Sequence, residues 1–157
     1  MTAAETSSVF TKAAAGEPFG PPLIGALLRV PWEEVQRHML VRLHERGFDD
    51  LDAAHLTVFQ YPGPQDSRPS DLAARLRISK QALNYQLREL ERLGYIRRQP
   101  DPDDLRAKRV VLTPRGASAI RVIREAVAEV ERNWAERLGA KRFEQLRRLL
   151  VELNQLA

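Results

Sequence analysis

The chain has 157 residues, of which 43% are hydrophobic and none is cysteine, and its formal net charge is +4. This length and apolar content are enough for one ordinary core, whereas the lack of cysteine excludes a disulfide framework and a cysteine nucleophile. No apolar run reaches the roughly eighteen residues of a membrane span. The N-terminus lacks the basic and apolar regions of a secretory signal. We therefore expect no membrane partner and a cytoplasmic location.

The chain begins with a polar segment that leads into an apolar helical pattern. Residues 1–20 are small, polar and interrupted by Gly and Pro, so we expect a disordered tail. After Pro21-Pro22, apolar residues keep helical spacing at Ile24, Leu28, Trp32, Val35, Met39 and Leu43. Pro31 lies inside this run and predicts either a kink or two abutting helices, and Gly47 ends it.

A short helix and a proline-rich loop follow. Asp52 is expected to cap a helix that contains Leu56 and Phe59 and stops before the sequence YPGP. The loop from there to Pro69 is long, and we expect it to hold at most a very short strand that pairs with the hairpin described below.

The next two predicted helices are separated by a tight break. Ser70 is predicted to be an N-cap, and Leu72 and Leu76 form a short buried stripe. After a break at residues 77–79, a second helix is opened by Ser79 and closed by Gly94. Two helices joined by such a turn form a helix-turn-helix, whose second helix enters the major groove of DNA.

The second helix of this pair has two different faces. Leucines at spacings of four and three predict one buried stripe: Leu83, Leu87 and Leu90. A separate polar face suits base edges and phosphates, and it consists of Gln81, Asn84, Tyr85 and Arg88. Taken alone, an ordinary solvated helix explains this polar face equally well.

A basic hairpin follows and favours the DNA-binding interpretation. Two short strands flank an Asp/Pro-rich turn, and the second strand carries Arg106 and Lys108. Residues 68–109 contain eleven Lys/Arg and six Asp/Glu, so their charge of +5 exceeds the +4 of the whole chain. Basic charge concentrated in one module is typical of a duplex binder. The alternative, an arginine-rich composition that merely reflects a GC-rich genome, does not explain why the charge is localised. A helix with a polar face followed by a basic hairpin indicates a winged helix-turn-helix.

The hairpin resembles the wing of the MarR family, the multiple-antibiotic-resistance regulators of bacteria and archaea. The family signature of Asp, any residue, Arg, five residues and Leu-Thr reads here as Asp104, Leu105, Arg106, AKRVV, Leu112 and Thr113. Asp101-Pro102 and Gly116 also occur where the family has them. The resemblance covers roughly residues 20–157 in element order and is specific over 70–116. Leu105 replaces the usual Gly or Arg, and Asn84-Tyr85 replaces Thr-Arg, so the base preferences of relatives do not transfer.

Two long amphipathic helices are predicted after the wing. Thr113 caps the first, with Pro114 at its first position, and its apolar stripe is Ile120, Ile123, Val127, Val130 and Trp134. Gly139 ends this helix, and the stripe of the last one is Phe143, Leu146, Leu150 and Leu153. We expect these stripes and the first helix to bury one another across a two-fold axis, as the resemblance also implies; the internal core of a monomer is the alternative.

The expected fold is therefore mainly α with a small β-wing, a winged helix-turn-helix with long N- and C-terminal dimerisation helices. After a disordered tail at 1–20, a single winged-helix domain spans 21–157. Within it, 51–113 form the DNA-binding module, and 21–47 and 114–157 form the dimerisation helices.

The predicted function is sequence-specific, DNA-binding transcriptional regulation by a homodimer on a palindromic operator, as a repressor relieved by a small ligand. The expected DNA contacts are Lys80, Gln81, Asn84, Tyr85, Arg88, Arg106 and Lys108. Gln81 and Asn84 read base edges in the major groove, and Arg106 enters the minor groove. Lys80, Tyr85 and Arg88 hold the helix against phosphates. Asp104 is expected either to hold Arg106 or to shape the turn.

No enzymatic pattern is recognisable, and we expect no catalytic activity, cofactor or metal. His38, His44 and His55 are the only histidines, and neither a glycine-rich phosphate loop nor a GxSxG motif occurs. A small-molecule cavity could be lined by Trp32, His38, His55, Phe59 and Tyr61. The resemblance implies an aromatic or lipophilic effector, although each of these residues taken singly is better explained as core.

Two other functions remain open at this point. One is a winged-helix protein-interaction module without DNA binding, and the other is the dimerisation and recognition part of an enzyme. Salt-dependent binding to random duplex DNA separates the first of these from a regulator.

Overall fold

The computed structural model describes residues 22–156, except for the side chain of Leu105. The chain divides into two compact units, one ending at Val35 and the other beginning at Gln36. The tail predicted at residues 1–20 lies outside the described residues. The second unit contains the helix-turn-helix, the hairpin and the two C-terminal helices.

Helix α2 (Ile24–Glu45) begins in the first unit and is continuous through Pro31, so the two abutting helices that this proline allowed do not occur. In the first unit, four of its apolar side chains are exposed, namely Ile24, Leu27, Leu28 and Trp32, whereas Val35 at the end of the unit is buried. In the second unit, Met39 and Leu43 are buried. The helix ends as predicted at Gly47, which has a φ of 81°, and the Phe48 amide donates to the Leu43 carbonyl at 3.0 Å.

Helix α3 (Ala53–Val58) begins at the predicted cap. The Asp52 carboxylate accepts from the His55 amide at 3.0 Å, and the His55 ring accepts from the Asp52 amide at 3.2 Å. This reciprocal pair satisfies two backbone donors that the first turn of a helix leaves unpaired. It also gives His55, which is 8% exposed, a structural role.

Helix α4 (Pro69–Leu76) begins two residues earlier than predicted. Arg68, not Ser70, is the N-cap residue, and the Ser70 hydroxyl donates to Asp71 instead. The reason is Pro69, whose fixed φ suits the first position of a helix. Helix α4 ends at Arg77, which takes the left-handed conformation with φ 54° and ψ 38°, and α5 (Lys80–Arg92) follows after the predicted three-residue turn.

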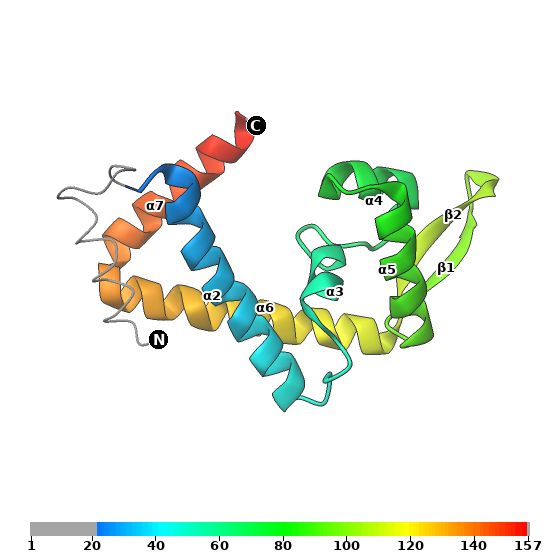
Figure 1. Ribbon diagram of the computed structural model, residues 1–157, viewed down its shortest axis with the longest axis horizontal. Coiled ribbons are helices and arrows are strands. Elements are labelled where there is room, and N and C mark those ends of the chain that lie inside the picture. Colours follow the sequence, from blue (N-terminus) through cyan, green and yellow to red (C-terminus); the bar gives the residue numbers. More distant parts are fainter. Residues whose placement is uncertain (1–21, 157) are drawn as a thin grey trace. The chain divides into compact units, whose positions relative to one another are not determined.

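The wing is an antiparallel pair of strands, β1 (Ile96–Asp101) and β2 (Asp104–Leu112), which Figure 1 shows beside α5. Ser67 forms a single bridge with Val110, which confirms the very short strand expected in the preceding loop. The Gln65 side chain extends this edge by accepting from the Leu112 amide at 2.9 Å.

Helix α6 (Pro114–Leu138) has the predicted bounds, with Thr113 as its cap, and α7 (Ala140–Gln155) follows the predicted break at Gly139. The buried face of α6 is shifted from the predicted stripe and consists of Ala119, Val122, Ile123, Ala126 and Val130. Of the predicted stripe, Ile120, Val127 and Trp134 are only half-buried. Ala119 and Ala126 are small enough to allow close packing of a neighbouring element, and the predicted stripe did not include them because it was chosen from large apolar residues.

The mainly α fold with a small two-stranded wing is confirmed. Within residues 22–156, none of the helices combines the length and the apolar character needed to cross a membrane.

Candidate nucleic-acid interface

The orientation of α5 is fixed by the leucines on its inner face. Leu83, Leu87 and Leu90 are at most 1% exposed, and the helix packs against α3 and α4. Its start is held by the Ser79 hydroxyl, which accepts from the Ala82 amide at 3.1 Å. Its end is closed by Gly94, with a φ of 80°. These contacts bury one face and leave the opposite face to solvent.

The predicted base- and phosphate-contacting residues of α5 all lie on exposed positions: Lys80, Gln81, Asn84, Tyr85 and Arg88. Tyr85 is 60% exposed, so this large aromatic side chain lies outside the core and is available for contact. Among residues 22–156, the Arg88 guanidinium donates only to the Asn84 carbonyl on its own helix, at 3.3 Å, which leaves most of its donors available.

The root of the wing is built around Asp101, whose side chain is fully buried. One oxygen accepts from Arg68 Nε at 2.5 Å, and the other lies 2.9 Å from Arg109 Nε and accepts from the Asp103 amide at 3.0 Å. These contacts, with Arg109 contributing most, lower the pKa of Asp101 to about 2. Asp101 therefore ties both strands to the residue that caps α4.

The tip of the wing presents basic side chains to solvent. The Asp104 carboxylate accepts from the Arg106 amide at 3.1 Å, which confirms that Asp104 shapes the turn. Arg106 and Lys108 are exposed, and among the described residues the Arg106 side chain forms neither a hydrogen bond nor an ion pair. A free guanidinium on a protruding turn is suited to a phosphate or a narrow groove.

Ion pairing sorts the arginines of this module into two groups. Some are engaged with carboxylates: Arg92 with Glu89, Arg98 with Glu91, and Arg68 and Arg109 with Asp101. Within the described part of the chain, the other basic residues of the module form no ion pair with a carboxylate, and these are Arg75, Arg77, Lys80, Arg88, Arg97, Arg106 and Lys108. Sequence reasoning counted both groups alike and did not single out Arg97, which is exposed on β1. The net positive charge is left on the helix and the wing.

Behind the interface lies a polar network that sequence reasoning missed. Tyr95 follows the end of α5 and is fully buried. Its hydroxyl donates to the Asp50 carboxylate, and Arg115 lies 2.8 Å from Asp50 and 3.1 Å from the Tyr95 hydroxyl. Burial and the bond to Asp50 raise the pKa of Tyr95 to about 12. Because Asp50 and Arg115 lie far from Tyr95 in sequence, no local pattern marked this network.

The residues predicted to line a ligand cavity have separate neighbours. Trp32 is exposed in the first unit. In the second, His38 Nε2 lies 2.9 Å from Glu129, Phe59 packs edge-on against Tyr95, and Tyr61 is 96% exposed. His55 is the capping residue described above. Within the second unit, the contacts do not bring His38, His55, Phe59 and Tyr61 together around one cavity.

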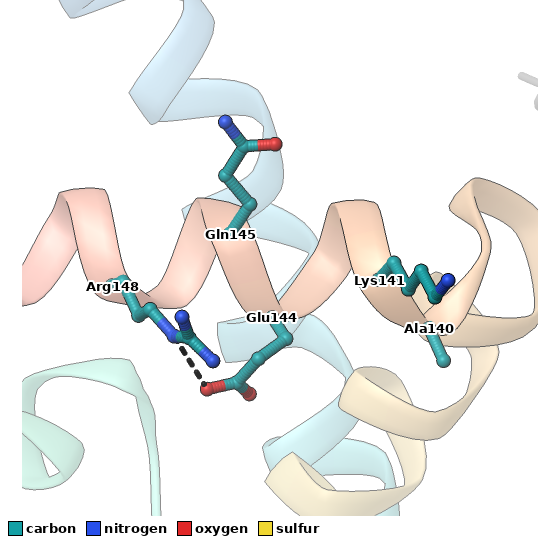
Figure 2. Close-up of a pocket in the computed structure, with 5 residues that line it drawn as sticks. All are labelled: Ala140, Lys141, Glu144, Gln145 and Arg148. Atoms are coloured by element: carbon teal, nitrogen blue, oxygen red, sulfur yellow. Dashed lines mark hydrogen bonds and ion pairs between the residues drawn. The ribbon is translucent and has the colours of Figure 1, made fainter.

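A hollow is present instead along α7 (Figure 2), lined by Ala140, Lys141, Glu144, Gln145 and Arg148. Glu144 and Arg148 form an ion pair across one turn, at 3.4 Å. All five residues come from one helix, so the hollow has no opposite wall. It therefore lacks the enclosure that small-molecule sites usually provide.

Two helices joined by a three-residue turn and followed by a basic β-hairpin define a winged helix-turn-helix protein. A family model described as the MarR family matches residues 60–107, which run from before α4 to the tip of the wing. The resemblance predicted from the wing signature is thus confirmed, and this segment is similar in sequence to the MarR family. No curated protein gives a significant match to the chain.

Several solved structures share the fold of this chain. A MarR family transcription regulator is 22% identical, with a TM-score of 0.64 over 98% of this chain and 92% of its own. The apo form of wild-type MarR from E. coli is 22% identical, with a TM-score of 0.65 over 84% of this chain and 96% of its own. MepR from S. aureus, solved as a DNA complex, is 23% identical, with a TM-score of 0.64 over 87% and 99%. The chain therefore has the fold of a MarR-family transcription regulator.

Proposed function

We propose that this protein is a sequence-specific, DNA-binding transcriptional regulator and not an enzyme. The observation that carries the proposal is the division of roles on α5. Its leucines are buried, while amide, phenol and guanidinium groups are exposed beside a wing whose tip arginine has no partner among the described residues. This arrangement offers hydrogen-bonding groups and unneutralised positive charge together, as duplex recognition requires.

In the proposed complex, α5 lies in the major groove. Gln81 and Asn84 pair with base edges, because an amide side chain can bond bidentately to adenine. Lys80, Tyr85 and Arg88 hold the helix against phosphates. Arg106 enters the adjacent minor groove, and Lys108 contacts the backbone beside it. The DNA complex of MepR, which shares the fold, makes this mode of binding the natural one to test.

The same proposal includes a homodimer on a palindromic operator. Exposed apolar side chains occur in both terminal regions, with Leu149, Val151 and Leu153 on α7 and Ile24 and Leu27 on α2. A second copy of the chain covers such faces and holds two winged modules about 34–36 Å apart, in successive major grooves. We further propose that a small aromatic or lipophilic ligand relieves repression, as the family resemblance implies.

The test is selection of binding sites from random duplex DNA, followed by affinity measurements over a salt series. The log–log slope of affinity against salt should be near −0.9 for each neutralised phosphate. Arg106→Ala should weaken binding about tenfold or more, as for loss of a charged contact. Arg121→Ala is the matched control, because Arg121 is an exposed arginine of α6 whose side chain donates a hydrogen bond to Ser118 and forms no ion pair within residues 22–156.

A slope near zero would instead support the protein-interaction module. Repeating the selection with phenolic ligands present tests the effector, which should lower operator affinity without changing the selected sequence.

A further inference from the structure

The segment that joins the recognition helix to the long helix α6 is held by an unusual concentration of contacts. Thr113, the cap of α6, donates its amide to the Tyr95 carbonyl at 3.0 Å and its hydroxyl to the Gly94 carbonyl at 2.6 Å. A Cβ placed on Gly116 would lie 2.0 Å from the same Tyr95 carbonyl oxygen. The backbone that ends α5 is thus in direct contact with the first turn of α6.

The Tyr95 side chain extends this joint to a third segment. Its ring packs with Phe48 and Phe59 at centroid distances of 6.2 and 6.3 Å, and its hydroxyl donates to Asp50. Arg115, in the first turn of α6, lies 2.8 Å from Asp50, with its guanidinium carbon 4.7 Å from the Tyr95 ring centroid. The turn before α3, the end of α5 and the start of α6 therefore meet in one hydrogen-bonded cluster.

A phenylalanine at position 95 would fill the same apolar space without the hydroxyl. A buried hydroxyl contributes little net stability and is costly when it lacks a partner, so the ring alone does not require it. The hydroxyl adds directional hydrogen bonds, which hold Asp50 and Arg115 at defined distances on two other segments. Such a network contributes less to the stability of the fold than to selecting one arrangement of the three segments.

We propose that Tyr95, Asp50 and Arg115 form a joint that fixes α5 relative to α6 and thereby sets the spacing of the two half-sites that the dimer selects. The proposal rests on the proposed function, because α6 belongs to the part of the chain expected to dimerise. The three residues are positioning residues that do not touch DNA. A looser joint lets the recognition helices of the dimer move apart or together, so that operators of several spacings bind equally well.

The experiment has two readouts. In the first, site selection uses duplexes with spacers of varied length between half-sites. The wild-type protein should prefer one spacing, and Tyr95→Phe should reduce that preference about fivefold, as for loss of a hydrogen-bonded constraint. The selected half-site sequence should not change. Arg115→Gln should act in the same direction, whereas its matched control Arg121→Gln, on the same helix, should not.

The second readout does not depend on DNA. The chain has no cysteine, so spin labels can be placed at the exposed positions of Ala82→Cys on α5 and Glu125→Cys on α6. Doubly labelled protein diluted with unlabelled copies reports the distance within one chain. Its distribution should be narrow in the wild-type protein and broader in Tyr95→Phe and Arg115→Gln.

The outcomes separate the joint from the proposed function. Unchanged distance distributions and spacing preference in folded Tyr95→Phe and Arg115→Gln would overturn the joint, even if thermal stability falls. If Tyr95→Phe does not fold, Arg115→Gln alone decides by the same two measurements. A wild-type protein with no sequence preference would overturn the proposed function and the role in spacing, while the labels would still show whether the cluster fixes α5 against α6.

Discussion

Gly116→Ala gives a sharp test of how closely α6 packs on the end of the recognition helix. Gly116 is buried in the first turn of α6, and its position leaves no room for a methyl group, which would lie 2.0 Å from the Tyr95 carbonyl oxygen. Ordinary van der Waals contact begins at 3.4 Å, so the backbone at Gly116 and the backbone at Tyr95 must move apart by about 1.4 Å. The neighbouring atoms cannot simply rotate away, because the nearest two belong to the Tyr95 backbone.

The magnitude follows from two opposing effects. Alanine favours a helix over glycine by roughly 1 kcal/mol, whereas overpacking typically costs about 1–3 kcal/mol. The movement also disturbs the capping bond from the Gly116 amide to the Thr113 hydroxyl, now 3.1 Å long, and loss of a cap costs about 1 kcal/mol. We expect a net loss of about 2 kcal/mol, or a fall in Tm of roughly 4–8 °C for a domain of this size.

The assay is urea unfolding followed by far-ultraviolet circular dichroism. Gly25→Ala is the matched control, because Gly25 is also helical but a Cβ added there would have nothing within 4 Å. This control should leave stability unchanged or slightly raised. If Gly116→Ala proved as stable as Gly25→Ala, the close approach of α6 to Tyr95 would be incorrect.

Three other predictions follow from the same structure. Asn84→Ala should reduce discrimination between operator variants by about 1–3 kcal/mol; an unchanged ranking in competition binding would remove its base-reading role. The pKa of Asp101 is lowered from 3.8 to about 2, so its contribution to stability is present above pH 3.8 and lost as the pH falls towards 2. Acid unfolding of Asp101→Asn should therefore show a weaker pH dependence over that range than the wild-type protein. Truncation after Leu138 should abolish specific binding to a palindromic site, and light scattering should give the mass of a monomer. A well-folded monomer with full operator affinity would contradict the proposed dimer.

Elements with local chemical signals could be predicted from the sequence. Ser79, Thr113 and Gly139 lie at helix boundaries because hydroxyl caps and a glycine of positive φ act on their own neighbours in the chain. The exposed face of α5 followed from helical periodicity in the same way. Ser70 failed because a second local signal, Pro69, competed with it and determined the helix start.

Features that depend on distant residues could not be predicted. The buried face of α6 includes Ala119 and Ala126, which reveal their role only when a neighbouring element packs against them. Asp50 and Tyr95 are separated by 45 residues, and Asp50 and Arg115 by 65, so their network has no signature at any fixed spacing. The pairing of arginines with carboxylates also depends on distant residues, and it separates the ion-paired arginines from those without a carboxylate partner in the described part of the chain.

The bridge between Ser67 and Val110 has a consequence for how the wing behaves at high concentration. A two-stranded hairpin has two open edges, each able to recruit a strand from another molecule. On the β2 edge, Asp66 donates to the Val110 carbonyl and Ser67 accepts from the Val110 amide, at 2.8 and 2.9 Å, while Gln65 accepts from Leu112. The β1 strand carries Pro100, which has no amide to offer, and the charged Arg97. With its edges occupied in this way, the hairpin resists intermolecular strand pairing and remains separate, so its tip stays accessible in solution.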